Sequence, residues 1–193
     1  MNEIKIKSQA WASENFNEEK YQNGDLIPVA KSSADWVKFS KSKEGCYAYL
    51  NFDSKNSNLG KYYNGYAILD KRGLAPEGWR IPSAEDFETL KNEVMSHDGD
   101  LLNLLAKNAW DKNFKALDSF KFSAKPSGIC NESGQFKALE TRFAIWSSTK
   151  VEKYLKGYNL DTYIDEDADE KEVTLEDYNY DLQRGLCVRL IKG

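Results

Sequence analysis

Histidine is almost absent from this chain, which has one, His97, among its 193 residues. A metal site built from several histidines is therefore excluded, and a Ser-His-Asp triad has no supporting motif. His97 directly precedes Asp98-Gly99, a pair typical of the end of a helix. We predict that His97 is an exposed residue at a helix end and takes no part in catalysis.

Cysteine is also scarce, because the chain contains three: Cys46, Cys130 and Cys187. They are too few and too widely spaced for a disulfide scaffold or for a zinc site of the C-x-x-C type. We therefore predict three free thiols, the state that a reducing compartment maintains.

Long apolar runs are missing. No stretch reaches the roughly 18 residues that a transmembrane helix requires, and the first seven residues lack the apolar segment of a secretory signal. We expect no membrane partner. If Met1 is the natural start, we expect a cytoplasmic protein; otherwise we expect one that is exported or part of a secreted particle.

A concentrated basic surface is missing as well. The chain has 27 Lys and Arg against 31 Asp and Glu, a net charge of −4, whereas a nucleic-acid binder needs clustered positive charge to neutralise phosphates. We expect no nucleic-acid partner. No internal repeat or low-complexity linker divides the chain, so we predict a single domain over residues 1–193, with a core supplied by the 13% aromatic content.

One acidic stretch has the carboxylate spacing of positions 1, 3, 5 and 12 of a calcium loop: Asp165, Asp167, Asp169 and Glu176. Glu170 stands where such a loop needs glycine for its sharp turn, and no amphipathic helices flank the segment. We predict an exposed acidic insertion over 165–177 and no metal site.

The clearest structural signal is a helix that begins after Pro82. Ser83 can cap it, and Asp86 completes a capping box three residues later. One apolar stripe follows at Phe87, Leu90 and Val94, and the helix should end near Met95. A second helix is predicted from Leu101 to about Trp110, capped by Asp98 or Asp100.

Strand patterns occupy both ends of the chain. We predict strands at 3–11, 120–124, 143–148, 154–163 and 186–190, with a hairpin loop at 131–134. Residues 17–45 are predicted as loop, with short strands around 26–27 and 36–37. This order predicts an α+β fold, with two helices, a mainly antiparallel sheet and long irregular loops.

Six sequence blocks resemble the bacterial Fib_succ_major family, the Fibrobacter succinogenes major paralogous domain. They are residues 9–17 (QAWASENFN), 47–67, 78–90 (GWRIPSAEDFETL), 124–128 (AKPSG), 146–149 (WSST) and 185–192 (GLCVRLIK). The blocks occur in the family's order and cover residues 9–192. The resemblance implies a C-type-lectin-like fold, distantly related to formylglycine-generating enzyme.

Aromatic residues supply the candidate binding site. Trp11, Trp79 and Trp146 lie inside the family blocks and are predicted to pack in the core. Tyrosines cluster between the Trp146 block and the terminal strand, where lectin-like folds present their ligand surface, and tyrosine suits recognition loops. The predicted ligand-binding residues are Tyr154, Tyr158, Tyr163, Tyr178 and Tyr180.

No motif supplies a nucleophile with its base, a metal cage or a loop that holds a cofactor, so we expect no catalytic residues and no cofactor. We predict a non-enzymatic binding module that recognises a protein or glycan partner through C-terminal loops. Two alternatives stay open. One is an oxidoreductase of the formylglycine-generating type, which the missing cysteine pair disfavours; the other is a structural or appended module of a phage-like or secretion apparatus.

Overall fold

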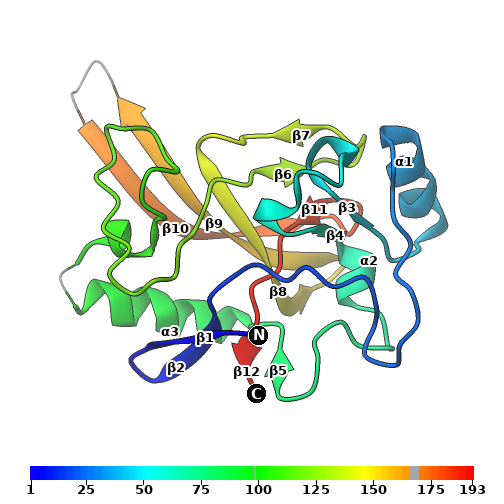
Figure 1. Cartoon of the computed structure of the whole chain (residues 1–193), viewed down its shortest axis with the longest axis horizontal. Coiled ribbons are helices and arrows are strands. Elements are labelled where there is room, and N and C mark those ends of the chain that lie inside the picture. The colour runs from blue at the N-terminus through cyan, green and yellow to red at the C-terminus, as the bar shows by residue number, and fades with distance from the viewer. Residues whose placement is uncertain (98, 166–169) are drawn as a thin grey trace.

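The computed structural model describes residues 1–97, 99–165 and 170–193, and it shows an α+β protein (Figure 1). The strands of this described part form three sheets, with strand orders β1-β2-β12-β5, β10-β9-β8 and β3-β4-β11-β6-β7. Every pairing between these strands is antiparallel. The predicted α+β class with mainly antiparallel sheet is confirmed.

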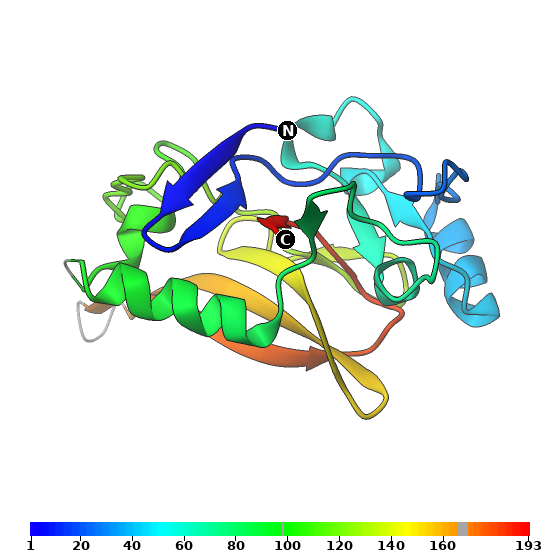
Figure 2. The same ribbon diagram turned by 90° about the horizontal axis from the view of Figure 1, so that it is seen from below.

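The first sheet joins the two ends of the chain. It contains β1 (Glu3–Ile6), β2 (Gln9–Ala12), β5 (Trp79–Arg80) and β12 (Ile191–Lys192). Ile191 pairs with Trp11 on one side and with Arg80 on the other. The predicted strand at 3–11 is therefore a hairpin that turns at Lys7, and the two termini lie on the same side of the molecule (Figure 2).

The second sheet is built from the three longest strands, β8 (Arg142–Val151), β9 (Tyr154–Asp165) and β10 (Glu170–Tyr180). Helix α3 (Ala84–Met95) lies along it (Figure 2), with Phe87, Leu90 and Val94 buried. The predicted apolar stripe thus packs against the sheet. The predicted strands at 143–148 and 154–163 are confirmed within β8 and β9.

The third sheet consists of short strands. They are β3 (Tyr47–Ala48), β4 (Tyr62–Asn64), β6 (Ile129–Cys130), β7 (Phe136–Lys137) and β11 (Gly185–Leu186). The predicted hairpin loop at 131–134 joins β6 to β7. Between the strands lie helix α2 (Gly65–Ile68) and the 3-10 turns η1 (Leu50–Phe52) and η2 (Ser57–Leu59).

Hydrogen bonds tie the family-like blocks to one another. The Pro82 carbonyl accepts from the Ser148 backbone N–H at 2.8 Å, and the indole Nε1 of Trp146 donates to the Tyr63 carbonyl at 2.7 Å. The Trp146 backbone N–H donates to the Cys187 carbonyl at 3.0 Å. These three bonds join four of the six blocks, which lie far apart in the chain.

Two helix predictions need correction. The segment predicted as a helix over 101–110 forms only the 3-10 turn η3 (Leu101–Leu104), because Leu105 is extended and the Ala106 N–H donates to the Ala124 carbonyl at 2.8 Å. Asp100 caps this turn, whereas Asp98 lies outside the described residues.

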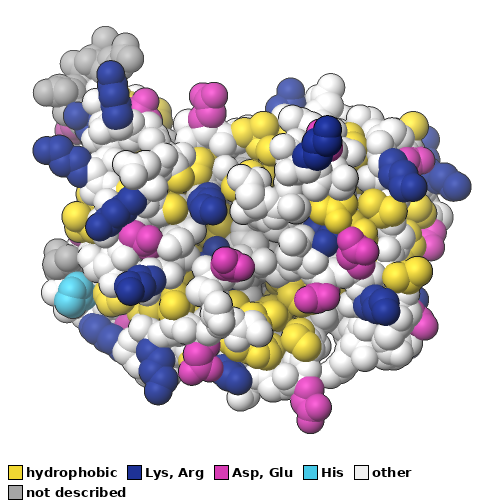
Figure 3. Space-filling model, viewed as in Figure 1, with side chains coloured by type: hydrophobic (Ala, Val, Ile, Leu, Met, Phe, Trp, Pro, Cys, Tyr) yellow, Lys and Arg dark blue, Asp and Glu magenta, His cyan; other side chains and the backbone are white. Residues whose placement is uncertain are grey.

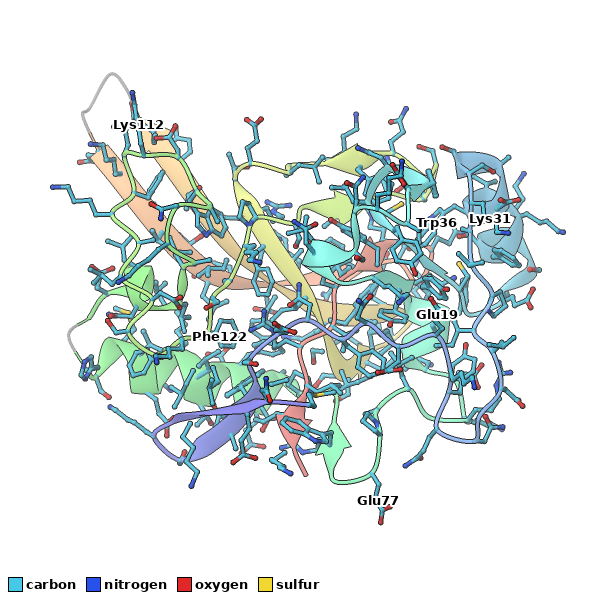
Figure 4. All side chains as sticks on the ribbon, viewed as in Figure 1. Glu19, Lys31, Trp36, Glu77, Lys112 and Phe122 are labelled. Atoms are coloured by element: carbon cyan, nitrogen blue, oxygen red, sulfur yellow. The ribbon has the colours of Figure 1, made fainter. Side chains whose placement is uncertain are left out.

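Residues 17–45, predicted as loop with short strands around 26–27 and 36–37, contain helix α1 (Ser33–Ser42), so the predicted strand at 36–37 is wrong. Ser32 caps α1 by accepting from the Asp35 N–H. Trp36 points from α1 toward the third sheet (Figure 4), and its ring lies directly above Gly185. A side chain at Gly185 would collide with that ring, so the glycine allows Trp36 of α1 to pack closely against this strand.

Three further predictions, one of an insertion and two of strands, also need correction. The acidic insertion predicted over 165–177 is largely strand β10, paired along β9 from Glu170 onward. Residues 120–124 do not form a strand, because Lys121 and Ser123 have positive φ values of 55° and 51°. The terminal strand predicted at 186–190 is replaced by the two short strands β11 and β12.

Candidate functional site

The five tyrosines predicted as a ligand surface all lie on β9 and β10 rather than on loops, and two of them are buried. Tyr158 is 2% exposed, and its ring stacks on Phe87 with the centroids 4.2 Å apart. Tyr180 is 6% exposed and covers Gly157, where a side chain would collide with the Tyr180 ring. The prediction is wrong for Tyr158 and Tyr180, because both point into the core.

Two tyrosines of the predicted set are well exposed, Tyr163 at 61% and Tyr178 at 43%, whereas Tyr154 is partly buried. Tyr178 lies 5.7 Å from the Arg142 guanidinium, and Arg142 forms a two-pronged ion pair with Asp161, both bonds 2.7 Å long. Tyr163 lies near the C-terminal end of β9 and lines a groove. Tyr163 is therefore the predicted residue that the fold places in a concave site.

The groove at Tyr163, which we call the Tyr163 groove, has a volume of about 600 Å³. Its walls come from residues 109–114, 139–141 and 162–164, with Pro126 between them. Trp110 and Phe114 are buried in its floor, whereas Asp111 and Glu140 are exposed. The groove thus combines an aromatic floor, an exposed aromatic ring and two carboxylates.

Hydrogen bonds from backbone and side-chain groups hold the groove walls in place. The segment after η3 runs beside the outer end of β9 (Figure 1). The Trp110 Nε1 group donates to the Ala124 carbonyl at 2.8 Å, and the Thr162 N–H donates to the Thr141 carbonyl at 2.9 Å. The Asp111 carboxylate accepts from the Asn113 N–H at 2.8 Å, which fixes the turn at the rim. The groove is therefore largely pre-formed.

Sequence reasoning missed most of this site. Asp111, Glu140 and Thr141 were not among the predicted binding residues, and Trp110 was placed on a helix. A usable signal was the polar turn Asp-Lys-Asn at 111–113, which separates two large aromatic residues.

On the face seen in Figure 3, basic and acidic side chains are interspersed.

The groups considered for catalysis lie away from the groove. Cys46, Cys130 and Cys187 are free and buried, as predicted for free thiols. Burial raises the pKa of all three thiols, that of Cys187 to about 12, so none is a reactive thiolate near neutral pH. His97 is exposed after α3 and packs against the edge of the Phe120 ring, as predicted for a helix-end residue.

Two residues of the calcium-like spacing, Asp167 and Asp169, lie outside the described residues. Among the residues that are described, no group of three or more His, Cys, Asp or Glu side chains is arranged to hold a metal ion. Within the same ranges, no helix has the length and apolar character to cross a membrane.

Comparison with known proteins gives one match. No curated protein and no solved structure is significantly similar to this chain. The family model described as the Fibrobacter succinogenes major domain matches residues 4–192, nearly the whole length. The six sequence blocks all lie within this match. The chain therefore belongs to the Fib_succ_major family.

Proposed function

We propose that this protein is a non-enzymatic binding module that recognises a glycan through the Tyr163 groove. The single observation that carries the proposal is the concave site itself, about 600 Å³ in volume, with aromatic and carboxylate side chains together. Pockets for small ligands have volumes of roughly 300–1,000 Å³ and combine apolar walls with a few polar groups. The Tyr163 groove has both properties.

The chemistry of the lining favours a sugar over a protein partner. A sugar ring has an apolar C–H face that can lie against an aromatic ring, and hydroxyl groups that can donate to carboxylates. Tyr163 supplies an exposed ring, and Asp111 and Glu140 supply acceptors near it. Hydrogen bonds to charged acceptors are stronger than those between neutral groups, so the two carboxylates would orient the sugar.

The proposed scaffold is a C-type-lectin-like fold. Support comes from the family relation, from the terminal strands joined in one sheet, and from the long loops that follow η3. The groove lies mostly between the family-like blocks, with Pro126 its one residue from a block. The hydrogen-bonded blocks would thus form a rigid frame, and the segments between them would bind the ligand.

The alternatives have less support. An oxidoreductase of the formylglycine-generating type needs accessible reactive thiols, whereas the three cysteines here are buried and have raised pKa values. A role as a structural module in a phage-like or secretion apparatus rests on analogy between folds alone.

The test is a glycan array, followed by titration of the best glycan into purified variants. Tyr163→Ala should weaken binding by roughly tenfold, since an aromatic contact residue contributes about 1–2 kcal/mol. Asp111→Asn should also weaken binding. Tyr178→Ala is the matched control, because Tyr178 is an exposed tyrosine of the same sheet outside the groove.

Retained affinity in Tyr163→Ala, or equal losses in Tyr163→Ala and Tyr178→Ala, would contradict the proposed groove. If the array shows no binding and a captured protein depends on Tyr163 instead, the groove is a protein-recognition site and the glycan assignment is wrong.

A further inference from the structure

A second cleft, lined by other residues than the Tyr163 groove, contains a buried arginine. Its volume is about 720 Å³, and its lining includes Asn15, Gly60, Lys121, Lys125 and Arg189. We call it the Arg189 cleft. It shares no lining residue with the Tyr163 groove.

Arg189 is 2% exposed, yet its hydrogen bonds are to neutral acceptors. The Nε and Nη2 groups donate to Asn15 Oδ1 at 3.0 and 2.8 Å, and Nη1 donates to the Phe122 carbonyl at 2.6 Å. The guanidinium also lies 4.7 Å from the centroid of the Phe122 ring, and Figure 4 marks this residue. These contacts fix the guanidinium firmly at the wall of the cleft.

Glu14 and Asp118 offset the positive charge of Arg189 from a distance rather than as ion-pair partners. Within the described ranges, no carboxylate oxygen lies within 4.0 Å of its nitrogens. Burial lowers the pKa of Arg189 to about 10, so the group is still charged at neutral pH. A buried charge without a directly paired counter-ion is costly, and most proteins pair such groups. An anion in the cleft would supply a direct partner.

The other charged residues of the cleft balance one another, which leaves the charge of Arg189 as the excess. Lys121 and Lys125 are exposed and line the cleft, whereas Glu3 and Glu14 oppose them with negative charge. With Arg189 included, cations exceed carboxylates in the lining. The backbone on this wall is also strained, because Lys121 and Ser123 both have positive φ, and such strain gathers at functional sites.

We propose that the Arg189 cleft binds a small ligand bearing an oxyanion, a carboxylate or a phosphate. Arg189 forms the fixed charge at the wall, and Lys121 and Lys125 close around the anion from the exposed side. Charge-assisted hydrogen bonds from a guanidinium and from ammonium groups are the usual means of holding both kinds of oxyanion. The ligand site is separate from the glycan site proposed above and does not depend on it.

The test is isothermal titration with sodium phosphate and, in a separate arm, sodium glucuronate, with glucose as the uncharged control. Saturable binding of either anion, with none of glucose, is expected. Lys121→Gln and Lys125→Gln should each weaken binding three- to tenfold, whereas Glu14→Gln should strengthen it. Lys31→Gln is the matched control, since Lys31 is an exposed lysine at the start of α1 (Figure 4) and lies outside the cleft.

A specific site predicts weaker anion binding in the Lys121 and Lys125 variants, stronger binding in Glu14→Gln and no change in Lys31→Gln. Nonspecific attraction to positive charge would instead weaken binding in Lys31→Gln as much as in the other two lysine variants. Binding of phosphate alone identifies a phosphate ligand, and binding of glucuronate alone identifies a carboxylate. If neither anion shows saturable binding, or if all four variants bind the anion with the same affinity, the proposal is wrong. Arg189 then has only a structural role.

Discussion

At the residue scale, Asp86 shows how one side chain serves both a helix and the tertiary structure. Its carboxylate accepts from the Ser83 N–H at 2.6 Å and from Arg80 Nη2 at 2.8 Å, while its backbone carbonyl accepts from Gln9 Nε2 at 2.9 Å. Partial burial alone would raise the pKa of Asp86, but the hydrogen bonds from Arg80 and Ser83 outweigh it and lower the pKa. The cap of α3 is therefore also a junction with the N-terminal hairpin.

Loss of the cap should destabilise the protein measurably. Ser83→Ala should lower the free energy of unfolding by about 1 kcal/mol, because the Asp86 N–H loses its acceptor. Urea denaturation followed by circular dichroism measures this. Ser54→Ala, at an exposed serine that caps no helix, should leave the midpoint almost unchanged. Equal midpoints for the two variants would show that the Ser83 cap contributes nothing.

Asp70 should make stability depend on pH. Hydrogen bonds from Arg72 lower the pKa of Asp70 to about 2, below its ordinary value of 3.8. A lowered carboxyl pKa stabilises the fold above about pH 4, and this contribution is lost as the pH falls from 4 to 2.

Asp70→Asn should therefore be less stable than the parent by about 1–2 kcal/mol at pH 7, with allowance for solvent screening at Arg72. The difference should shrink toward zero near pH 2. Denaturation midpoints of both proteins across this range are the measurement. A difference that stays constant with pH would mean that the ionised carboxylate is not the stabilising group.

At the element scale, the packing of α3 on β9 buries Tyr158, one of the predicted binding tyrosines. Tyr158 stacks on Phe87, and its hydroxyl lies 3.2 Å from both the Ala84 carbonyl and Glu88 Oε1. Burial raises the pKa of Tyr158. Tyr163, on the opposite face of the same strand and five residues farther on, is exposed.

This arrangement predicts opposite behaviour for two tyrosines of one strand. Tyr158→Ala should cost about 3–5 kcal/mol of stability, because it leaves a cavity beside Phe87. Tyr163→Ala should change stability by less than about 0.5 kcal/mol. Chemical denaturation checks both values, with Tyr158→Phe as a milder control that removes only the hydroxyl. A stable Tyr158→Ala protein would contradict the assignment of Tyr158 to the core.

At the scale of the whole molecule, strands from the two ends of the chain share one sheet, and the three cysteine side chains are buried. Ile191 pairs with Trp11 and Arg80, and the Arg189 side chain binds segments around Asn15 and Phe122. All three cysteines lie inside the structure formed in this way. Their reaction with a thiol reagent therefore requires the structure to open.

Thiol titration should give about three reactive groups per chain in denaturant without reductant, because the three cysteines are free. In the native protein at pH 8 the reaction should be slow, since burial raises the pKa of each thiol. The measurement is the time course of reaction with a chromogenic disulfide. Recovery of one thiol in denaturant would reveal a disulfide, and rapid native reaction would mean that a cysteine is accessible.

The sequence by itself determined the features that depend on neighbours in the chain. The family blocks, the Ser83 cap with its apolar stripe, the hairpin at 131–134 and the strands at 143–148 and 154–163 all have local signals. The free thiols also followed from cysteine number and spacing.

Only the tertiary structure decided the rest, because the deciding contacts join residues far apart in the chain. Leu105 leaves the helical path to pair with Ala124, and α1 is held by Trp36 against Gly185. The same holds for the candidate sites, where Tyr163 and Asp111 line one groove and the Arg189 guanidinium donates to Asn15 Oδ1. Local propensity cannot select among such contacts, since burial and hydrogen bonding between distant segments outweigh it.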